Sequence, residues 1–498
     1  MKSWQPEAGN RSFSNQPSLR IRRPSLSEHY DLIAVGSSFA TAFFLDGYLP
    51  RARPDERVLV LERGTFDALE WQLEHKKSSS LQTGEEVRND SGKRWVYVLA
   101  VGGASNGWWA CTPRMMPNDF RLRSKYGVGI DWPLGYDDLE EHYSRAEEIM
   151  SVSGPPDCDL FPRSRPFPQP PHRFSEPDKL LKATYPDTYF QQASARARET
   201  TDTRFACCAS SVCEFCPVAA KFTILGDMMR VFEDPRVTLE TEATVTHIDT
   251  TGNVATGVRY RQDGMDKIAT ADLVALGANA LFNPYLLMRS GLDHPILGRH
   301  LHEQVSVYVT VDLDGVDNFQ GSTSITANGY MLYDGEHRSD YAAALIESHN
   351  IYFGKALRVE RGKWRQRMEL KFIFEDLPQE KNRIVLDSPD DEVPRVIYEG
   401  HSDYAQRGID RLPEVLPQLL SPLPIERIGI GGINDTESHI IGTTPMGDDP
   451  ATSIVDRHLR HHAVRNLLVL GSSVYPTSSP SNPTLTLSAL SLWAAAQL

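Results

Sequence analysis

Mostly apolar runs and turns of small residues alternate along the first part of the chain. Residues 30–35 and 57–61 are short apolar runs that predict buried parallel strands, and residues 42–49 predict a helix between them. A Gly-Ser-rich turn at residues 36–41 follows the first run, and Glu62 follows the second. Strand, glycine turn, helix, strand and acid in this order predict a Rossmann-like unit.

The turn carries candidate nucleotide-binding chemistry. In such a unit the helix N-terminus, here at Gly36, Ser37 and Ser38, meets a pyrophosphate, and an acid, here Glu62, binds the ribose hydroxyls of an adenosine. Ser38 and Thr41 stand where the fingerprint has its second and third glycines. A plain strand–helix–strand unit is therefore the alternative, and an acid 26 residues after Gly36 favours the dinucleotide interpretation.

The last sixty residues hold the strongest candidates for chemistry. His439 and Asn482 stand 43 positions apart, each beside a tight turn, with an apolar run at residues 466–470 between them. Oxidation of an alcohol needs a base for the hydroxyl proton and a second polar group that holds the same oxygen. These two residue types suit the two roles. Taken singly, such a histidine is more often a turn or core residue, and an asparagine before proline a turn former or helix cap.

Bulk properties exclude several classes of function. With 498 residues, 40% of them hydrophobic, the chain is long enough for two or three domains or one elaborated α/β unit. A formal charge of −14 disfavours nucleic acid and anionic membranes as partners, and no apolar run approaches the roughly 18 residues of a membrane span. Residues 1–28 are rich in Ser, Arg, Pro and Gln, and we expect them to form a flexible tail on a cytoplasmic protein.

Further motifs follow in order over nearly the full length. They are residues 101–106 (VGGASN), 131–143 (DWPLGYDDLEEHY), 275–278 (ALGA), 297–303 (LGRHLHE), 438–447 (SHIIGTTPMG) and 480–484 (PSNPT). With the glycine turn and Glu62, this set resembles the glucose–methanol–choline (GMC) oxidoreductases, which are FAD enzymes that oxidise alcohol groups of sugars, sterols and small alcohols. Residues 374–378 (FEDLP) and 382–386 (NRIVL) are similar to the pyranose oxidase and bacterial FAD-dependent sugar dehydrogenase branch.

The resemblance implies roles for residues in the C-terminal motifs. His439 matches the catalytic base, which takes the hydroxyl proton while the carbinol hydride passes to flavin N5. Asn482 matches its partner position, which is asparagine in the sugar-oxidising branch. Pro483 and Thr484 would begin a final helix over residues 484–496, whose positive end would lie by the flavin N1–C2=O edge and stabilise the reduced flavin anion.

The resemblance also places the cofactor. The loop beside the isoalloxazine matches Gly102, Gly103, Ser105 and Asn106. Several relatives attach FAD covalently through a histidine in this loop, and the aligned position here is Gly107, so we expect non-covalent FAD. The other positions expected to bind FAD are Ala278, Gly471 and Ser472.

The implied fold class is α/β, with a Rossmann-like FAD-binding domain of the GMC fold and an antiparallel-sheet substrate-binding domain. Residues 29–305 and 430–498 are expected to form the FAD-binding domain, with cap insertions at about 64–200. Strands expected between residues 236 and 260, and an apolar run at residues 271–277, would close that domain. Residues 306–429 are expected to form the substrate-binding domain over the pocket.

Four of the six cysteines, Cys207, Cys208, Cys213 and Cys216, lie within ten residues. Where thiols stay reduced, such clustering points to metal or iron–sulfur ligation before disulfides. The adjacent pair departs from the Cys-x-x-Cys spacing of a zinc ribbon. The segment is similar to that of bacterial FAD-dependent glucose dehydrogenases, which hold a three-iron cluster, but differs by one residue between the last two cysteines. An iron–sulfur cluster, a structural cysteine turn and a zinc site all stay open.

The function that this resemblance implies is FAD-dependent oxidation of a CH–OH group of a sugar, glycoside or related polyol to a carbonyl. A small hydroxylated molecule is the expected substrate, and the electron acceptor is left open. Two alternatives stay open. They are oxidation of another hydroxylated, secondary metabolite, and a non-catalytic electron-relay flavoprotein subunit. A pyridine-nucleotide dehydrogenase is disfavoured, because the C-terminal motifs have no place in that fold.

Overall fold

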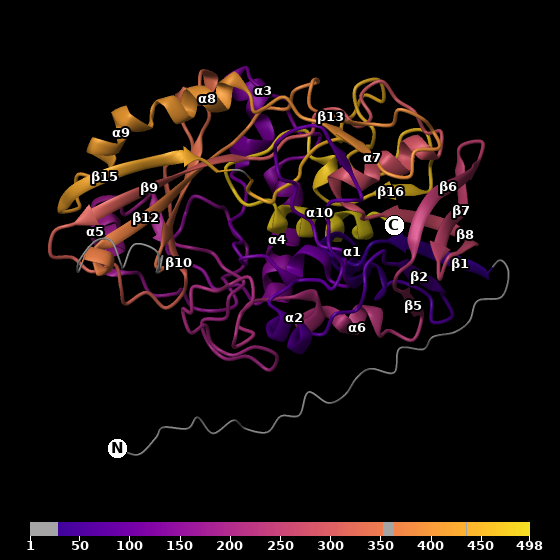
Figure 1. Ribbon diagram of the computed structural model, residues 1–498, viewed down its shortest axis with the longest axis horizontal. Helices are drawn as coiled ribbons and strands as arrows, with labels where there is room; N and C mark the ends of the chain where they lie inside the picture. The colour runs from indigo at the N-terminus through magenta and orange to yellow at the C-terminus, as the bar shows by residue number, and fades with distance from the viewer. Residues whose placement is uncertain (1–27, 352–362, 435) are drawn as a thin grey trace, which may run out of the picture.

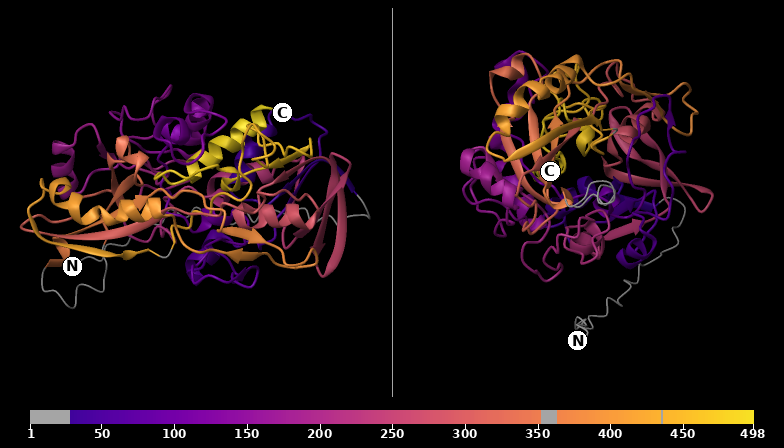
Figure 2. Two further views of the ribbon diagram at one scale, coloured as in Figure 1. Left: turned by 90° about the horizontal axis from the view of Figure 1, so that it is seen from above. Right: turned by 60° about the vertical axis from the view of Figure 1, so that its left-hand side comes forward.

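The computed structural model describes residues 28–351, 363–434 and 436–498 (Figure 1). The expected N-terminal tail, apart from residue 28, lies outside the described residues. Two large sheets lie towards opposite ends of the longest axis, with helices between them (Figures 1 and 2). The fold is of the α/β class predicted from the sequence.

One large sheet is built around the predicted Rossmann unit. Its strands are β1 (Glu28–Val35), β2 (Val58–Leu61), β5 (Val237–Glu240), β6 (Thr244–Thr251), β7 (Val254–Gln262), β8 (Met265–Leu276) and β16 (Leu467–Val469). The strand order is β5-β2-β1-β8-β7-β6, and β16 also pairs with β8. Strands β5, β2, β1, β8 and β16 run parallel, whereas β6, β7 and β8 form an antiparallel meander.

The C-terminal helix packs against the helix of the N-terminal unit. The α-helices of the described residues are α1 (Phe39–Tyr48), α2 (Leu69–His75), α3 (Leu122–Tyr126), α4 (Tyr136–Met150), α5 (Glu176–Thr184), α6 (Met229–Phe232), α7 (Asn279–Arg289), α8 (Asp403–Asp410), α9 (Leu412–Leu419) and α10 (Thr484–Ala496). Helix α10 packs on α1 and on α4. It begins and ends at the predicted residues.

Two glycines on neighbouring segments replace those missing from the fingerprint. A Cβ atom on Gly277, just after β8, would lie 2.6 Å from Oγ1 of Thr41 and 3.1 Å from the carbonyl oxygen of Val35. A Cβ atom on Gly103 would lie 2.7 Å from Cβ of Ser38. The close approach that the fingerprint glycines normally allow is therefore kept, because the glycine stands on the facing segment instead.

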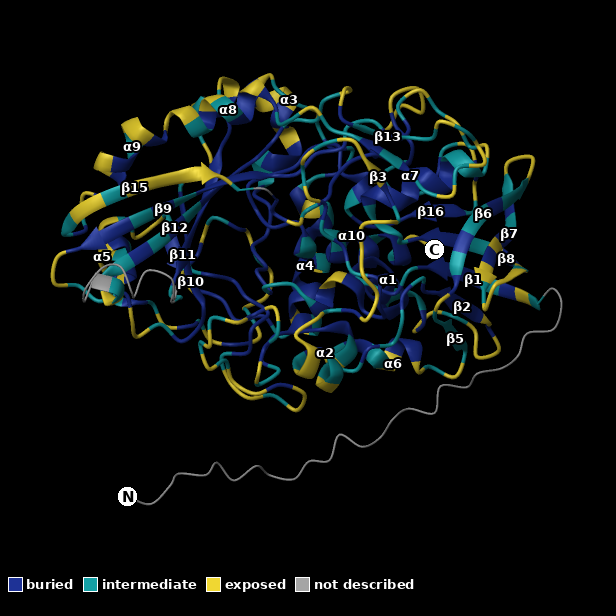
Figure 3. Ribbon diagram, viewed as in Figure 1, coloured by how far each residue is buried: buried dark blue, intermediate teal, exposed yellow. Residues whose placement is uncertain are grey.

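The second large sheet is antiparallel. Its strands are β4 (Tyr189–Gln191), β9 (Val305–Leu313), β10 (Ile325–Leu332), β11 (Ala344–His349), β12 (Arg367–Phe374) and β15 (Ile425–Ile433). They follow the order β15-β9-β12-β11-β10-β4. Strand β15 forms one edge and is the most exposed strand of this sheet (Figure 3).

One face of this sheet is apolar and the other is polar. Val309, Ile346 and Leu370 lie in a hydrophobic cluster with residues of α8 and α9. Because side chains alternate between faces along a strand, Lys371 of β12 and Glu347 of β11 lie on the opposite face, and these two residues pair across the strands.

Segments from both sides of the expected domain boundaries build the sheets. Strand β15 crosses the boundary expected at residues 429 and 430, and β4, from the expected cap insertion, joins the antiparallel sheet. A small sheet of β3 (Arg88–Asn89), β13 (Arg383–Val385) and β14 (Arg395–Ile397) also joins distant segments. The division into domains stays a prediction. Within the described residues, no helix combines the length and apolar character needed to cross a membrane.

Replacement of Gly277 by alanine should destabilise the protein, because the added methyl group would crowd Thr41 and the Val35 carbonyl. Overpacking of this kind costs about 1–3 kcal/mol in the free energy of unfolding, which chemical denaturation measures. Adding Thr41→Ala should restore part of the loss. Gly92→Ala is the matched control, because a Cβ atom there meets nothing within 4 Å. An equal loss in this control would contradict the packing argument.

Candidate active site

The glycine turn after β1 and the acid after β2 are held together by hydrogen bonds. The backbone N–H and the hydroxyl of Ser37 donate to Oε2 of Glu62 over 2.9 and 2.6 Å, and the N–H of Gly64 donates to Oε1 over 2.7 Å. Burial raises the pKa of Glu62, and these hydrogen bonds oppose the rise. The carboxylate therefore lies beside the turn, where a Rossmann unit binds the ribose of an adenosine.

The same turn contacts the predicted flavin loop. The hydroxyl of Ser37 accepts a hydrogen bond from the N–H of Gly102 (3.2 Å), and the hydroxyl of Ser38 donates to the Gly102 carbonyl (3.3 Å). Ser38 precedes α1 without capping it, so its side chain leaves the N-terminal N–H groups of α1 available to an anion. The structure thus brings together the two segments predicted to bind the cofactor.

Residues 103–106 form a 3₁₀ turn, η1 (Gly103–Asn106), that is anchored from several directions. The hydroxyl of Ser105 accepts from the N–H of Ile224 (3.1 Å), and Nδ2 of Asn106 donates to the Val101 carbonyl (3.1 Å). Oδ1 of Asn106 is buried without a hydrogen-bond partner, as expected where a ligand completes the site.

Lys221 clamps this loop, a role that the sequence did not suggest. Its Nζ donates to the carbonyls of Asn106 (2.7 Å), Trp108 (3.2 Å) and Glu214 (2.8 Å). Burial lowers the pKa of Lys221 to about 8, and nearby thiols and Glu214 oppose the shift. The bonds of this lysine tie the predicted flavin loop to the cysteine-rich segment.

The candidate base is oriented by a glutamine. Nδ1 of His439 lies 2.8 Å from Oε1 of Gln304. Nε2 of Gln304 donates to the carbonyls of Ser479 (2.8 Å) and Ser481 (2.7 Å), which fixes the orientation of the amide. Since the glutamine oxygen can only accept, Nδ1 of His439 carries the proton and Nε2 carries the free lone pair.

The surroundings of His439 keep it neutral. Burial lowers its pKa to about 4, while the charges of Glu437 and Glu347 raise it and that of Lys371 lowers it. At neutral pH the imidazole is therefore unprotonated at Nε2 and able to accept a proton.

Asn482 lies on the loop that Gln304 also contacts. Its Oδ1 is buried and has no hydrogen-bond partner, although more than nine in ten buried polar groups have one. Gln304 contacts both His439 and Ser481, the neighbour of Asn482, so one side chain links the two predicted catalytic positions. Helix α10 begins two residues after Asn482.

Two models of a known protein family match this chain. Models of the GMC oxidoreductase family match residues 191–306, for its N-terminal part, and residues 429–491, for its C-terminal part, which includes His439 and Asn482. The chain belongs to the GMC oxidoreductase family.

This GMC oxidoreductase is similar to several named enzymes over most of its length. It is 27% identical to the fructose dehydrogenase large subunit of Gluconobacter japonicus over 80% of each chain. It is 27% identical to the 6'''-hydroxyparomomycin C oxidase of Streptomyces lividus and to the paromamine 6'-oxidase of Streptomyces fradiae, each over 93% of this chain and 90% of the relative. Pyridoxine 4-oxidase from Mesorbium loti has the same fold, with a TM-score of 0.66 and 17% identity over 94% of this chain and 99% of that one.

The remaining positions predicted to bind cofactor lie around the ends of β8 and β16. The N–H of Ala278 donates to Oδ1 of Asn283 (2.9 Å), and Nδ2 of Asn283 donates to the Leu470 carbonyl (3.0 Å). The hydroxyl of Ser472, after Gly471, donates to the Ile440 carbonyl (2.6 Å). Asn283 thus joins two predicted segments, and Ser472 ties them to the residue after His439.

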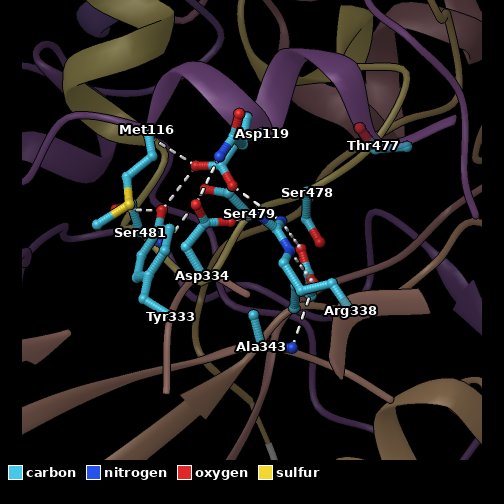
Figure 4. Close-up of polar contacts among 12 residues, drawn as sticks. Met116, Asp119, Tyr333, Asp334, Arg338, Ala343, Thr477, Ser478, Ser479 and Ser481 are labelled. Atoms are coloured by element: carbon cyan, nitrogen blue, oxygen red, sulfur yellow. Dashed lines mark hydrogen bonds and ion pairs between the residues drawn. The ribbon is translucent and has the colours of Figure 1, made fainter. Parts of the chain in front are cut away.

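A buried network supports the loop that carries Asn482 (Figure 4). Arg338 lies 2.8 Å from Asp119 and 2.6 Å from Glu375, and all three side chains are inaccessible to solvent. The hydroxyl of Tyr333 lies 2.8 Å from Oδ2 of Asp119 and 2.9 Å from the hydroxyl of Ser481. Segments of the expected cap insertion, of the expected substrate-binding domain and of the C-terminal motif therefore meet at one buried ion cluster.

The clustered cysteines are held by protein groups. The thiol of Cys207 lies 3.6 Å from Oγ1 of Thr323, and that of Cys213 lies 3.2 Å from the hydroxyl of Ser324. Cys208 is exposed. Over the described ranges, no group of three or more His, Cys, Asp or Glu side chains is placed to hold a metal ion.

In this arrangement the thiols of Cys207, Cys208, Cys213 and Cys216 do not form a ligand set that fits a metal ion or an iron–sulfur cluster. Thiols with hydroxyl and backbone partners agree better with a structural cysteine turn. Whether iron or zinc binds here stays a prediction of the sequence.

No sequence motif pointed to Gln304, although it directly follows the motif at residues 297–303. The polar face of the antiparallel sheet was also missed. Strict alternation of apolar and polar residues in 305–313 and 367–372 could have indicated it.

Gln304→Met should slow alcohol oxidation by roughly 10–100-fold, because the imidazole of His439 loses the group that selects its tautomer. The change is measured as the turnover number at saturating substrate. Gln406→Met is the matched control. Gln406 lies in α8, outside the site, and its Oε1 lies 2.8 Å from Nε2 of His401. Equal turnover of the two variants would rule out an orienting role for Gln304.

Proposed function

We propose that this GMC oxidoreductase oxidises a CH–OH group of a sugar, glycoside or related polyol to a carbonyl, with non-covalent FAD as cofactor and His439 as base. The observation that carries the proposal is the contact between His439 and Gln304. It leaves a neutral imidazole with a free lone pair at Nε2, next to the loop of Asn482.

The residues that would hold FAD fit that cofactor. The Gly36 turn, the uncapped start of α1 and Glu62 suit its pyrophosphate and adenosine. The unpartnered Oδ1 atoms of Asn106 and Asn482 leave room for polar contacts with a ligand. When bound, FAD accepts the hydride from the carbinol carbon at N5.

The protein's own part in the reaction is proton transfer and positioning. Nε2 of His439 takes the hydroxyl proton, which makes the ring an imidazolium. The side-chain carbonyl of Gln304 stabilises this cation by accepting the hydrogen bond from its Nδ1–H. The side chain of Asn482 holds the substrate oxygen. Because the loop of Asn482 is anchored by buried bonds to Tyr333 and Gln304, its side chain is positioned before substrate arrives.

The substrate class rests on the polar sheet face and on the relatives. A sheet face with carboxylates, an imidazole and a lysine suits a molecule with several hydroxyl groups better than an apolar alcohol. Relatives named for fructose, paromamine and a C-glycoside agree with this class. Oxidation of another hydroxylated metabolite is the second candidate, favoured by 26% identity to 2-methyl-1,2-propanediol dehydrogenase of Mycolicibacterium austroafricanum over 79% of each chain.

His439→Ala should lower turnover by about 10²–10⁴-fold while FAD stays bound, because only the proton acceptor is lost. Substrate-dependent bleaching of the flavin absorbance under anaerobic conditions measures this. His461→Ala is the matched control, since burial also lowers the pKa of His461 to about 4 and the charged groups that act on it are His462 and His294 rather than groups of the candidate site. An unchanged rate in His439→Ala would refute the role.

The wild-type rate should also show where the base titrates. His439 must be neutral to accept a proton, and its pKa is lowered to about 4. We therefore expect kcat/KM to stay constant as the pH falls through the usual histidine range near 6.5 and to drop only close to the lowered pKa. A half-maximal value near pH 6.5 would show that the burial of His439 does not control its titration.

Acid precipitation of the purified protein should release the flavin into the supernatant, because Gly107 offers no side chain for a covalent link. Flavin absorbance that stays with the pellet would contradict non-covalent binding.

Iron and acid-labile sulfide measured on the same sample test the cysteines. From their arrangement we expect neither in stoichiometric amount, and finding both would restore the cluster interpretation.

A further inference from the structure

The polar face of the antiparallel sheet carries two rows of side chains. In one row Tyr308 of β9 pairs with Lys371 of β12, which pairs with Glu347 of β11. In the next row Glu369 of β12 pairs with His349 of β11. Because side chains two residues apart lie on the same face of a strand, both rows lie on one surface.

This surface lies beside the candidate base. Nζ of Lys371 forms an ion pair with Glu437, two residues before His439. The charges of Lys371 and Glu347 both act on the pKa of His439. The ring of His349 stacks with Trp109, which follows the predicted flavin loop, at a centroid distance of 6.5 Å. The two rows therefore bound the space that a substrate of His439 would occupy.

His349 is the unexplained group of this surface. It is 4% exposed, and neither ring nitrogen has a hydrogen-bond partner. Its Nε2 lies 3.7 Å from Oε2 of Glu347, and its Nδ1 lies 3.9 Å from Oε1 of Glu369, which also has no hydrogen-bond partner. Three unpaired polar atoms at one buried place cost free energy unless a ligand satisfies them.

Among the described residues, His349 is the one group that lies within ion-pair distance of both carboxylates. Lys371 is taken by Glu437, so neither Glu347 nor Glu369 forms an ion pair with lysine or arginine within 4 Å, as far as the described residues go. Arg196 acts on Glu347 from beyond ion-pair distance. Its guanidinium donates to neutral groups, and one of these, Gln192, donates through Nε2 to Oε1 of Glu347 over 3.2 Å. Two carboxylates thus share one imidazole.

The two carboxylates respond differently to their surroundings. Burial alone would raise the pKa of Glu347, but His349, Lys371 and Arg196 together lower it to about 2, so Glu347 stays charged. Burial raises the pKa of Glu369, whereas the charges of His349, Lys371 and Arg367 lower it, and Arg367 is itself paired with Asp312. A cation placed between the two carboxylates would remove the penalty at Glu369.

We propose that the substrate carries a protonated amine that binds at Glu347, His349 and Glu369, while the hydroxyl to be oxidised lies at His439. The substrate class is therefore an amino sugar or aminocyclitol. This inference rests on the proposed alcohol oxidation and adds the charge of the substrate. A neutral polyol could satisfy the atoms that lack hydrogen bonds but would bring no positive charge to Glu369, whose one ion-pair partner within 4 Å among the described residues is His349, so the site discriminates against it.

The test uses the holoenzyme and matched glycosides. Positional isomers of an amino hexoside are compared with their N-acetyl derivatives and with the neutral hexoside, by kcat/KM from anaerobic flavin reduction. For at least one isomer we expect kcat/KM for the amine to exceed kcat/KM for both neutral forms by about tenfold or more, in line with a buried charge pair.

Glu369→Gln should reduce this amine-to-neutral ratio by about tenfold, because it keeps the size of the side chain and removes its charge. Glu141→Gln is the control, because the side chain of Glu141 is 78% exposed on α4. Glu369→Gln should also keep or raise the melting temperature, since burial already disfavours the charge of Glu369. A merely structural carboxylate would lower it.

The outcomes separate this inference from the proposed function. If wild-type enzyme oxidises neutral hexosides as well as every amino isomer, the amine site is wrong and the proposed alcohol oxidation stands. If no hydroxylated compound of either kind reduces the flavin, both proposals fail. A ratio that Glu369→Gln leaves unchanged overturns the assignment of Glu369.

Discussion

The side-chain amide of Gln304 accepts a hydrogen bond from His439 and donates two to the loop before Asn482. An amide has a carbonyl end and an N–H end, so the two backbone carbonyls that it meets decide which end faces the histidine. That choice in turn decides which ring nitrogen of His439 carries the proton. The rest of the site depends on this constraint, because only the remaining nitrogen can act as a base.

Buried charge recurs wherever segments from different parts of the chain meet. Arg338 joins Asp119 to Glu375 under the loop of Asn482, and Lys371 joins the antiparallel sheet to Glu437. Removing one partner from such a group leaves an uncompensated charge, which makes these contacts geometrically demanding. Together with the amide of Gln304, they tie the segments that carry His439 and Asn482 to the antiparallel sheet and its neighbouring turns.

Much of the fold followed from the pattern of the chain. The first strand, the helix and the second strand, the C-terminal helix and the strand before it all stand where apolar runs and turn residues predicted them. Local patterns suffice for such elements because their period and their end signals lie within a few residues. The missing glycines of the fingerprint were visible too, but their replacements at Gly103 and Gly277 are far away in sequence and became apparent only in three dimensions.

The sequence by itself determined the family, the Rossmann-like unit, the candidate pair of His439 and Asn482, and the loop at Gly102, because each rests on short motifs whose residue types and order can be read along the chain. Tertiary structure decided which distant side chains complete the site. It brought Gln304 to His439, placed the hydroxyls of Thr323 and Ser324 beside the thiols of Cys207 and Cys213, and aligned His349 with two carboxylates on one sheet face. The physical reason is that hydrogen bonds, ion pairs and desolvation act between neighbours in space, and the register of an antiparallel sheet sets which residues become neighbours.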